Sequence, residues 1–482
     1  MIRPYIQLLI LSCATAFFSI SCRNEKAPKV KISVTTNDYS VKSLKVNSSD
    51  MLTFEPILLS EAKFDSNGRA TLEFNLTSAT FASFELGKQW VSLYLEPGYD
   101  LEVKLDTLND DAIQFSGKGT ETNNYLVQSQ RIYKTFRQRG GKNFWELNPF
   151  ELIGRLDSLR RDYASFHSSY CDSTNLPKNT RRILELKNKL LLISYKQNFL
   201  LTHSIDSKGK DQYPEQLLNI SREIPLDDDL LSYRMEDYSR VLSWYLELEL
   251  RRVNLKSKKG TENIDDILPL IINDSIAKDK KYPSCLKEFL IANNIYSTMK
   301  SSGLIQVPDS LFKGFKHKYP SSEYLPQLQR LADKCLAISP GSIAPDITGT
   351  TIDGISLSLK ELRGKVVYVD VWATWCGPCR KEFPSSKEIQ EHFGQNDNIV
   401  FLFVSIDQDK AAWRKMVTDE KEIKGIHINL NEEQMRKSYL ISGVPWFILI
   451  DHDGKIVNAD APKPSSGKVE NEIRKQLKRI KS

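Results

Sequence analysis

Between about residues 30 and 115, hydrophobic and polar residues alternate in short runs. Arg69–Leu76 alternates in this way, and Val91–Asp106 contains two such runs around Pro97-Gly98. A period of two residues is typical of strands with one buried face, and Pro-Gly between two runs favours a hairpin. We therefore expect residues 23–118 to form a small antiparallel β-domain, built as a sandwich.

The pattern changes after the segment Phe115–Leu126. From there to about Ala337 the chain is rich in Leu, Lys, Glu and Arg and poor in Gly, and Asp229–Leu255 has apolar residues at helical spacing. Turn-forming residues interrupt the pattern at Asp206–Glu215 and Lys256–Asp266. The pattern predicts an all-α domain of several antiparallel helices over residues 119–338.

In the last part of the chain, apolar runs alternate with helical patterns. Lys365–Ala373 and Asn398–Asp407 are apolar enough to be fully buried strands, Trp446–Val457 favours a hairpin, and Lys468–Ile480 is an amphipathic helix pattern. Buried strands that alternate with helices indicate a mixed sheet with helices on both faces. Residues 339–482 are therefore expected to be an α/β domain, and the whole chain to be multidomain.

Composition narrows the classes of function. The 67 basic and 61 acidic residues give a net charge of +6 without a basic block, so we expect no nucleic-acid partner. The six histidines form no pair at metal-ligand spacing, and no GxGxxG nucleotide fingerprint is present. We expect neither a bound metal nor a cofactor.

Residues 1–22 have the pattern of a secretory signal. Arg3 precedes an apolar run from Tyr5 to Ile20, which is short for a membrane span, and small residues lead to Cys22. The end of this segment resembles a bacterial lipoprotein box, although Ser19 stands where that family prefers Leu. The resemblance implies cleavage, lipidation of Cys22 and a membrane anchor in the periplasm or cell envelope. Ordinary cleavage and an uncleaved anchor are the alternatives.

The motif WCGPCR, Trp375–Arg380, is the strongest chemical signal in the chain. Cys376 and Cys379 come between a buried strand and a helix, where the free N–H groups and dipole of the helix start favour a thiolate. Two intervening residues let the sulfurs meet, and Pro378 suits the first helical turn. The spacing predicts a redox pair.

Two other interpretations of the cysteine pair, a metal site and a structural disulfide, are less well supported. A zinc site needs two more ligands, but Cys171, Cys285 and Cys335 are isolated cysteines of another domain, and no His follows at finger spacing. A purely structural disulfide closing so small a loop would stabilise the fold little. Among the three isolated cysteines, one structural disulfide remains open because pairing cannot be derived from sequence.

The segment VDVWATWCGPCRKEFP resembles the active site of thioredoxin-fold oxidoreductases. The APD opening near residue 344, the EFP ending and the later segment GVPWFILID are similar to the TlpA/ResA-like group of membrane-tethered thiol–disulfide proteins. YLEPGYD and FSGKGTETNNYL resemble, more loosely, the N-terminal halves of Bacteroidetes-type lipoproteins. The resemblance implies a thioredoxin fold for residues 339–482.

The resemblance also implies roles for four residues. Cys376 would attack a substrate disulfide, and Cys379 would resolve the mixed disulfide, leaving a Cys376–Cys379 disulfide. Asp370 matches a buried carboxylate that handles protons for the resolving thiol; alternatively, it is a strand-end Asp that makes hydrogen bonds. Glu382 matches a glutamate of the active-site cleft; alternatively, it is a first-turn Glu that favours the helix dipole.

Substrate contacts are implied at Trp375, Gly377, Pro378, Val444 and Pro445. Trp372 is expected in the core. A cis peptide before Pro445 would leave the Val444 backbone open to an extended substrate.

Two positions depart from the thioredoxin pattern. Phe403 falls where thioredoxins have a Lys, and Trp446 follows Pro445 where they have Thr. The Trp446 ring would either narrow the groove or pack inward.

We therefore expect a reductase that acts on disulfides of exported proteins, because Gly377-Pro378 is the dipeptide of reducing thioredoxins. It would draw electrons from a membrane partner. Disulfide oxidase or isomerase activity is an alternative, since the compartment also sets direction. A peroxidase is disfavoured because the peroxiredoxin motif Pro-x-x-x-Thr-x-x-Cys is not matched. A binding or scaffold lipoprotein, whose N-terminal half recruits a partner, is the alternative from a different class.

Overall fold

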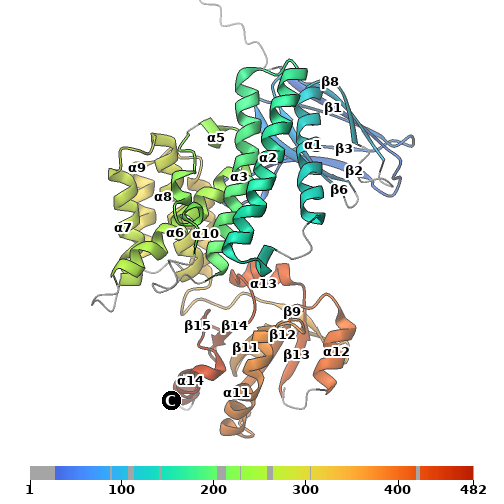
Figure 1. The fold of residues 1–482 in the computed structure, drawn as a ribbon. Helices are drawn as coiled ribbons and strands as arrows, with labels where there is room; N and C mark the ends of the chain where they lie inside the picture. Colours follow the sequence, from blue (N-terminus) through green and yellow to red (C-terminus); the bar gives the residue numbers. More distant parts are fainter. Residues whose placement is uncertain are drawn as a thin grey trace, which may run out of the picture.

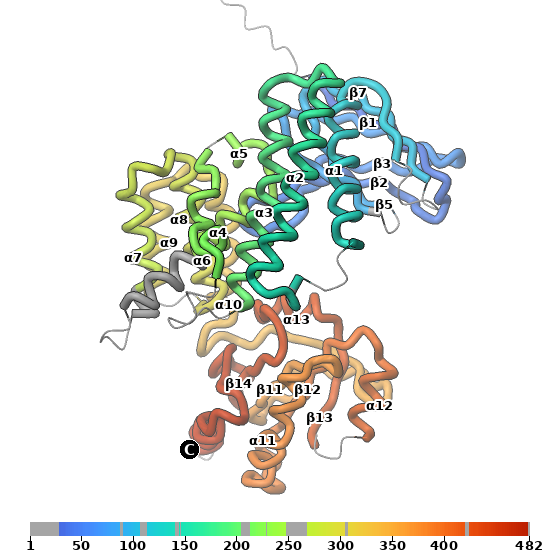
Figure 2. The backbone as a smooth tube through the Cα atoms, in the orientation of Figure 1, coloured from blue at the N-terminus to red at the C-terminus, as the bar shows by residue number. Residues whose placement is uncertain are grey.

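The computed structural model describes most of the chain. The described ranges are 28–86, 89–106, 113–139, 144–203, 213–227, 229–257, 264–303, 306–419 and 424–480. The expected signal segment with Cys22 lies outside them, as does most of the expected helix break at 206–215. Figures 1 and 2 show a sandwich of strands, a group of helices beside it, and a C-terminal α/β unit below both.

The first part of the chain forms two sheets of four strands each. Their orders are β4-β1-β7-β8 and β3-β2-β5-β6. The strands are β1 Lys29–Thr36, β2 Ser43–Ser49, β3 Pro56–Lys63, β4 Arg69–Asn75, β5 Thr80–Leu86, β6 Gln89–Leu95, β7 Asp100–Leu105 and β8 Ile113–Lys118. β1 and β7 run parallel, so the expectation of a wholly antiparallel domain is wrong for this pair.

The expected hairpin around Pro97-Gly98 is also wrong. β6 pairs with β5, whereas β7 pairs with β1 and β8, so the turn carries the chain from one sheet to the other. The far edge of β6 is occupied by the Asn123 side chain, which accepts from Tyr94 N (2.9 Å) and donates to Tyr94 O (3.0 Å). Alternation identifies a strand with a buried face, but it does not identify the partner of that strand.

The middle of the chain is helical. Its elements are α1 Thr120–Gln138, η1 Phe144–Glu146, α2 Pro149–Ser173, α3 Lys178–Thr202, α4 Glu215–Leu218, η3 Ile220–Arg222, α5 Asp229–Ser232, α6 Glu236–Ser257, α7 Ile264–Lys278, α8 Ser284–Ser302, α9 Gln306–Lys318 and α10 Leu325–Ala337. α1 lies against β6 and β8 of the sandwich, α2 and α3 pack beside α1, and α6 to α10 form a second group of helices next to them (Figure 1). The second group meets the sandwich through Glu236 of α6, which accepts from Ser49 Oγ (2.7 Å), and Gln327 of α10, which donates to Asp50 (2.6 Å).

The sandwich and the helices share one core. A single cluster of buried apolar side chains extends from Val30 in β1 to Cys335 in α10. The expected continuous helix over 229–255 is interrupted between α5 and α6, where Arg234 has a φ of 50°. At this interruption the helical domain is joined to the sandwich, because Tyr233 O accepts a hydrogen bond from Phe81 N of β5 (2.8 Å).

The C-terminal part is a thioredoxin-like α/β unit built on a seven-stranded sheet of order β10-β9-β13-β12-β11-β14-β15. Its elements are β9 Thr348–Thr351, β10 Ser356–Ser358, η4 Leu359–Leu362, β11 Val366–Trp372, α11 Gly377–Phe393, β12 Ile399–Ser405, α12 Lys410–Asp419, β13 Ile426–Asn429, α13 Glu432–Tyr439, β14 Trp446–Ile450, β15 Ile456–Asn458, η5 Pro464–Ser466 and α14 Val469–Ile480. The thioredoxin fold is confirmed for this part.

The two faces of this sheet bury different helices. Alternate residues of β11, Val366 and Tyr368, share a cluster with Ile389 of α11 and Ile473 of α14. Val367, Val369 and Val371 belong to the cluster that contains α12 and α13 side chains. Every residue of β11 is buried, as the unbroken apolar run predicted. β11 lies between β12 and β14 inside the sheet, so its last residues lie in the middle of the end of the sheet at which β11 finishes.

Two connections join the C-terminal unit to the rest. The segment after α10 runs along β15: Gly341 N donates to Ile456 O (2.7 Å) and Ala344 N donates to Gly454 O (2.9 Å). Leu440, which follows α13, packs against the core of the N-terminal half. The unit is thus held at its β15 edge and beside α13.

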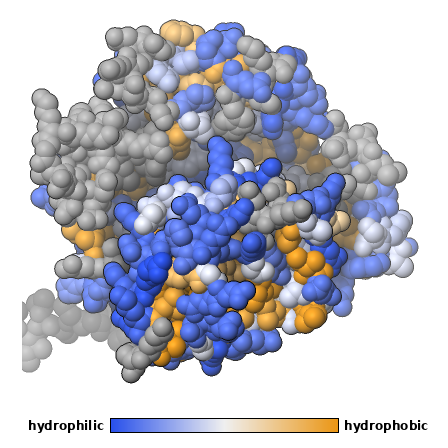
Figure 3. Space-filling model, turned by 90° about the horizontal axis from the view of Figure 1, so that it is seen from below, coloured by the Kyte–Doolittle hydropathy of each residue, from blue (hydrophilic) through white to orange (hydrophobic). Residues whose placement is uncertain are grey.

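Across the described residues, no helix is long and apolar enough to span a bilayer. Seen from below, the coloured surface is largely hydrophilic with separate hydrophobic areas (Figure 3). These areas do not merge into one apolar band in that view.

Candidate active site

The cysteine pair lies at the junction between β11 and α11. Cys376 is the residue just before α11, Cys379 is in its first turn, and the two form a disulfide with their Cα atoms 5.3 Å apart. Cys376 is 4% exposed and Cys379 is 1% exposed. The order of exposure is that expected for an attacking and a resolving sulfur, although both sulfurs are largely covered in the oxidised state.

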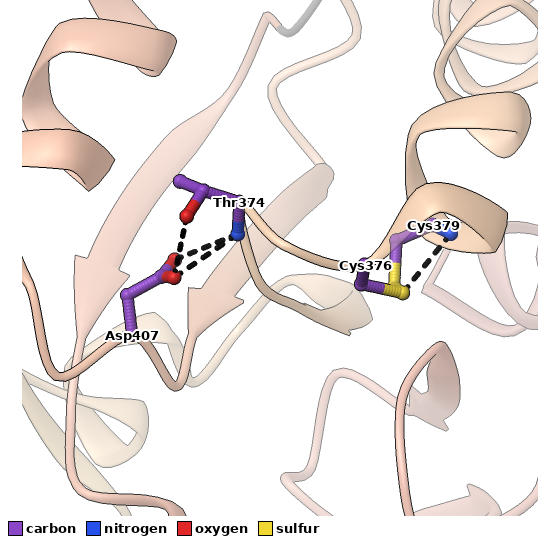
Figure 4. Close-up of a disulfide and its surroundings, with 4 residues drawn as sticks. All are labelled: Thr374, Cys376, Cys379 and Asp407. Carbon is purple, nitrogen blue, oxygen red and sulfur yellow. Dashed lines mark hydrogen bonds between the residues drawn. A yellow bond between two sulfur atoms is a disulfide. The ribbon is translucent and has the colours of Figure 1, made fainter. Parts of the chain in front are cut away.

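The start of α11 is directed at Cys376. The backbone N–H of Cys379 donates to Cys376 Sγ (3.1 Å; Figure 4). Pro378 stands in the first turn of α11, where no backbone N–H is needed. An unpaired N–H group and the positive end of the helix dipole favour negative charge at that sulfur. In the reduced state this position lowers the cost of a Cys376 thiolate, which is the nucleophilic form of cysteine.

Asp407, which the sequence analysis did not select, fixes the loop before the cysteines. Its carboxylate accepts from Thr374 N (3.1 and 2.9 Å) and from Thr374 Oγ1 (2.7 Å), and also from Ser405 Oγ (2.9 Å). Figure 4 shows Thr374 turned toward Asp407 and away from the disulfide. Asp407 follows β12, the parallel neighbour of β11, so the carboxyl ends of both strands meet here. That shared edge was the available signal in the sequence.

Asp370 is buried within β11 and faces α11. Its neighbours in register are apolar, Phe403 on β12 and Phe447 on β14. Within the described part of the chain, neither carboxyl oxygen has a hydrogen-bond partner, so the alternative of a hydrogen-bonded strand-end Asp does not hold. Burial raises the pKa of Asp370 to about 8, and the charge of Glu382 adds to the rise.

Glu382 lies one turn beyond Cys379 on α11 and is also buried. Its carboxylate accepts from Ser465 N and from Ser465 Oγ, both at 2.9 Å, and Lys463 Nζ lies 3.5 Å away. These contacts come from the segment around η5, and Glu382 is not in the first turn of α11. The alternative of a first-turn Glu that favours the helix dipole therefore does not hold. Ser465 and Lys463 were missed because they lie about 80 residues away in sequence.

The aromatic and loop residues around the cysteine pair differ in how exposed they are. Trp375 is 67% exposed, and Gly377 and Pro378 are exposed as well. Trp372 is instead buried and packs edge-on against Phe383, with ring centroids 5.3 Å apart. Trp375 therefore offers an apolar surface beside the disulfide, whereas Trp372 supports the sheet from within.

The Val444–Pro445 peptide bond is cis. Trp446, at the start of β14, is in register with Val371 of β11, so Pro445 is level with the end of β11. The Trp446 ring packs inward, where Nε1 donates to Ala459 O (2.8 Å). Of the two orientations left open for Trp446, the inward one is found, and the ring does not narrow the groove at Val444.

The remaining described cysteines lie apart from this site. Cys171 and Cys335 are buried thiols and Cys285 is an exposed one, so a disulfide among them is not present. Cys171 Sγ lies 3.7 Å from His167 Nε2, and burial raises the pKa of the Cys171 thiol. Within the described ranges, no cluster of His, Cys, Asp and Glu has the makings of a metal site.

Comparison with known proteins matches the C-terminal unit. The family model described as Redoxin matches residues 339–477. Thiol-disulfide oxidoreductase ResA of Bacillus subtilis (strain 168) is 31% identical over 124 residues, which cover 25% of this chain and 66% of ResA. ResA of Geobacillus thermodenitrificans (strain NG80-2) is 30% identical over 120 residues, covering 25% of this chain and 68% of that protein. The chain thus spans just under two thirds of the Bacillus subtilis relative.

Solved structures match the same part. The thioredoxin domain of a thiol-disulfide oxidoreductase from Bacteroides vulgatus is 33% identical, with 28% of this chain and 96% of that chain covered and a TM-score of 0.26. A thiol:disulfide interchange protein from Bacteroides sp. is 30% identical, with 30% and 93% covered and a TM-score of 0.26.

Proposed function

Because the chain belongs to the TlpA/ResA-like family of thioredoxin-fold thiol–disulfide oxidoreductases, we propose that it reduces disulfide bonds of exported proteins through Cys376 and Cys379. The observation that carries this proposal is the disulfide at the start of α11, with the Cys379 N–H directed at Cys376 Sγ. That arrangement favours thiolate at one sulfur and places the second sulfur within bonding distance of it.

In the proposed reaction, the Cys376 thiolate attacks one sulfur of a substrate disulfide. The substrate S–S bond breaks, its other sulfur leaves as a thiolate that takes a proton, and a mixed disulfide forms. The Cys379 thiol then loses its proton and attacks Cys376 Sγ, which releases the second substrate sulfur. Two electrons pass from the cysteine pair to the substrate, and the Cys376–Cys379 disulfide remains.

The substrate would bind as an extended segment beside Pro445. Among the described residues, neither the N–H nor the C=O of Val444 has a hydrogen-bond partner, and the peptide bond that follows Val444 is cis. Pairing of a substrate strand with Val444 would place its disulfide near Cys376. The exposed Trp375, with Gly377 and Pro378, would cover the other side.

The location and the electron source are part of the proposal. The signal-like segment 1–22 supports export to the periplasm or cell envelope, with Cys22 as the lipid-anchored residue. Each turnover leaves the pair oxidised, and the sequence offers no fingerprint for NAD or flavin. A membrane protein that delivers electrons as thiols would therefore have to reduce Cys376–Cys379 again.

The test is the equilibrium reduction potential of the pair in the chain from Arg23 to Ser482, by titration in redox buffers with Cys376→Ser as the control. A reductase is expected near thioredoxin's potential, roughly −270 mV. A value near roughly −120 mV would make the protein an oxidant and contradict the proposal. If the pair does not titrate, the activity would belong to the first 338 residues, as in a binding lipoprotein.

A further inference from the structure

The segment 462–465, at the start of η5, makes hydrogen bonds with Glu382 of α11 and with Tyr368 of β11. Ser465 donates two hydrogen bonds to Glu382, one to each carboxylate oxygen. Three residues earlier, Pro462 O accepts from the Tyr368 hydroxyl (2.9 Å), and Tyr368 is the residue two before Asp370 on the same face of β11. The segment 462–465 therefore holds a neighbour of Asp370 on the strand and Glu382 on the helix.

The charged and titratable groups around Asp370 are few. Glu382 comes from α11, Tyr368 from β11, Lys463 from the segment before η5, and Glu472 of α14 acts on Tyr368. On the flanking strands the residues in register with Asp370 are Phe403 and Phe447, which carry no charge. Burial is the main cause of the raised pKa of Asp370, and the nearby charge of Glu382 adds to it.

Ser465 determines the position of the Glu382 charge. Hydrogen bonds to a carboxylate favour its charged form, and two bonds to the two oxygens also fix its orientation. Lys463 adds an ion pair, but its side chain is 59% exposed, so solvent screens that contact. Ser465 is itself exposed at the surface, but both of its bonds end on the carboxylate of Glu382, which is almost fully buried and where a hydrogen bond is less easily replaced by water.

We propose that Ser465 is a positioning residue for thiol–disulfide exchange, because its two hydrogen bonds hold the Glu382 charge beside Asp370 and thereby set the pH at which Asp370 exchanges the proton of Cys379. The inference rests on the proposed function for its catalytic meaning. The effect of Ser465 on the charge of Glu382 and on the titration of Asp370 does not depend on the reaction that the protein catalyses.

When Cys379 resolves a mixed disulfide, its S–H bond breaks, the proton goes to the Asp370 carboxylate, and the new thiolate forms the S–S bond with Cys376. The substrate sulfur leaves with the electron pair of the broken mixed disulfide. Asp370 then returns its proton to solvent. A base whose pKa is near the working pH is deprotonated in part of the molecules and is still basic enough to take a proton from a thiol.

Neighbouring serines supply a matched pair of variants. Ser465→Ala removes one donor to Glu382 and keeps the backbone N–H. Ser466→Ala removes a hydroxyl that is exposed in the same short helix and donates to Lys463 O (2.6 Å), not to Glu382. Glu382→Gln removes the charge itself. Asp370→Asn removes the titrating group.

The first experiment is an infrared titration of the oxidised full chain, from about pH 5 to about pH 10. Subtraction of the Asp370→Asn spectrum isolates the carboxyl band of Asp370. Ser465→Ala should move its midpoint down by roughly half to one pH unit, and Glu382→Gln further. Ser466→Ala should leave it unchanged. An unchanged midpoint in Ser465→Ala, or an equal shift in Ser466→Ala, would overturn the inference.

The second experiment follows the reaction with 5,5′-dithiobis(2-nitrobenzoic acid), using the reduced full chain. Attack by Cys376 releases one chromophore and resolution by Cys379 a second; Cys379→Ser gives the first phase and the background of other thiols. The pH profile of the second phase should move with the infrared midpoint in each variant. If the wild type has no second phase, the proposed function fails while the infrared result still decides the role of Ser465.

Discussion

At the scale of single residues, Asp370 is buried, and none of the described residues donates a hydrogen bond to its carboxyl oxygens. A charged carboxylate in that place would lose its hydration and gain nothing in return, so the folded state favours the protonated form. The unfolded chain has no such preference, since a solvated Asp titrates near pH 4. Folding and proton binding are therefore coupled at this residue.

We expect that coupling to make the C-terminal unit less stable as pH rises. Between about pH 4 and the folded pKa of about 8, the folded state holds a proton that the unfolded state has released, so stability falls with pH. Asp370→Asn should remove this fall and raise the free energy of opening at pH 8, relative to pH 4, by roughly 2–4 kcal/mol.

Native-state hydrogen exchange of the β11 amides in the oxidised chain, corrected for intrinsic rates, measures that free energy. Asp353→Asn in the exposed turn between β9 and β10 is the control and should behave as the wild type. If the free energy of opening depends on pH in the same way in the wild type and in Asp370→Asn, then Asp370 is not the group that couples folding to proton binding.

At the scale of elements, the loop between β11 and α11 depends on a residue from the next strand. Asp407 accepts from both the N–H and the hydroxyl of Thr374, two residues before Cys376. Without Asp407, the part-buried Thr374 N–H would have no acceptor. Loss of this hydrogen bond should therefore destabilise the loop measurably. The hydrogen bonds therefore tie the loop before the cysteines to the end of β12.

Asp407→Ala should loosen this loop. We expect exchange of the Thr374 amide to become at least about tenfold faster and the unit to lose about 1–3 kcal/mol. Thr374→Val keeps the N–H bond and loses only the hydroxyl bond, so its amide should stay protected. Equal protection of the Thr374 amide in wild type and Asp407→Ala would show that the loop has another support.

The elements of the C-terminal unit were predictable because their signals are local. β11 is an unbroken apolar run, and WCGPC lies where strand and helix meet, so fold and cysteine pair followed from adjacent residues. Ser465 and Asp407 were missed because each acts on a residue far along the chain. The turn at Pro97-Gly98 failed for the same reason: whether β7 pairs with β6 or with β1 depends on what occupies the edge of β6, and Asn123 does.

At the scale of the whole molecule, the segment after α10 is bound to β15 and is not a loose tether. Its backbone donors at Gly341 and Ala344 are satisfied, and a protease must release a segment before cleaving it. The joint between the two halves should therefore resist digestion. Gly341 also has a φ of 90°, which proline cannot adopt.

Gly341→Pro should make this joint the preferred site of cleavage, at least about tenfold faster than in the wild type, because it removes the bond to Ile456 and strains the backbone. Mass spectrometry after a protease of broad specificity would locate the cuts. Ile343→Thr, which keeps every backbone donor, should remain resistant. Rapid cleavage of the wild type within residues 339–344 would contradict the expectation.

The shared core from Val30 to Cys335 has a consequence for how such a chain can be divided. We expect the two β-sheets and the helices after them to fold only together, because a cut after Lys118 would divide one buried apolar cluster between the two pieces. The C-terminal unit has buried apolar clusters of its own and meets the N-terminal cluster at Leu440. We therefore expect the chain to unfold as two units, with the sandwich and its helices as one and the thioredoxin-like part as the other.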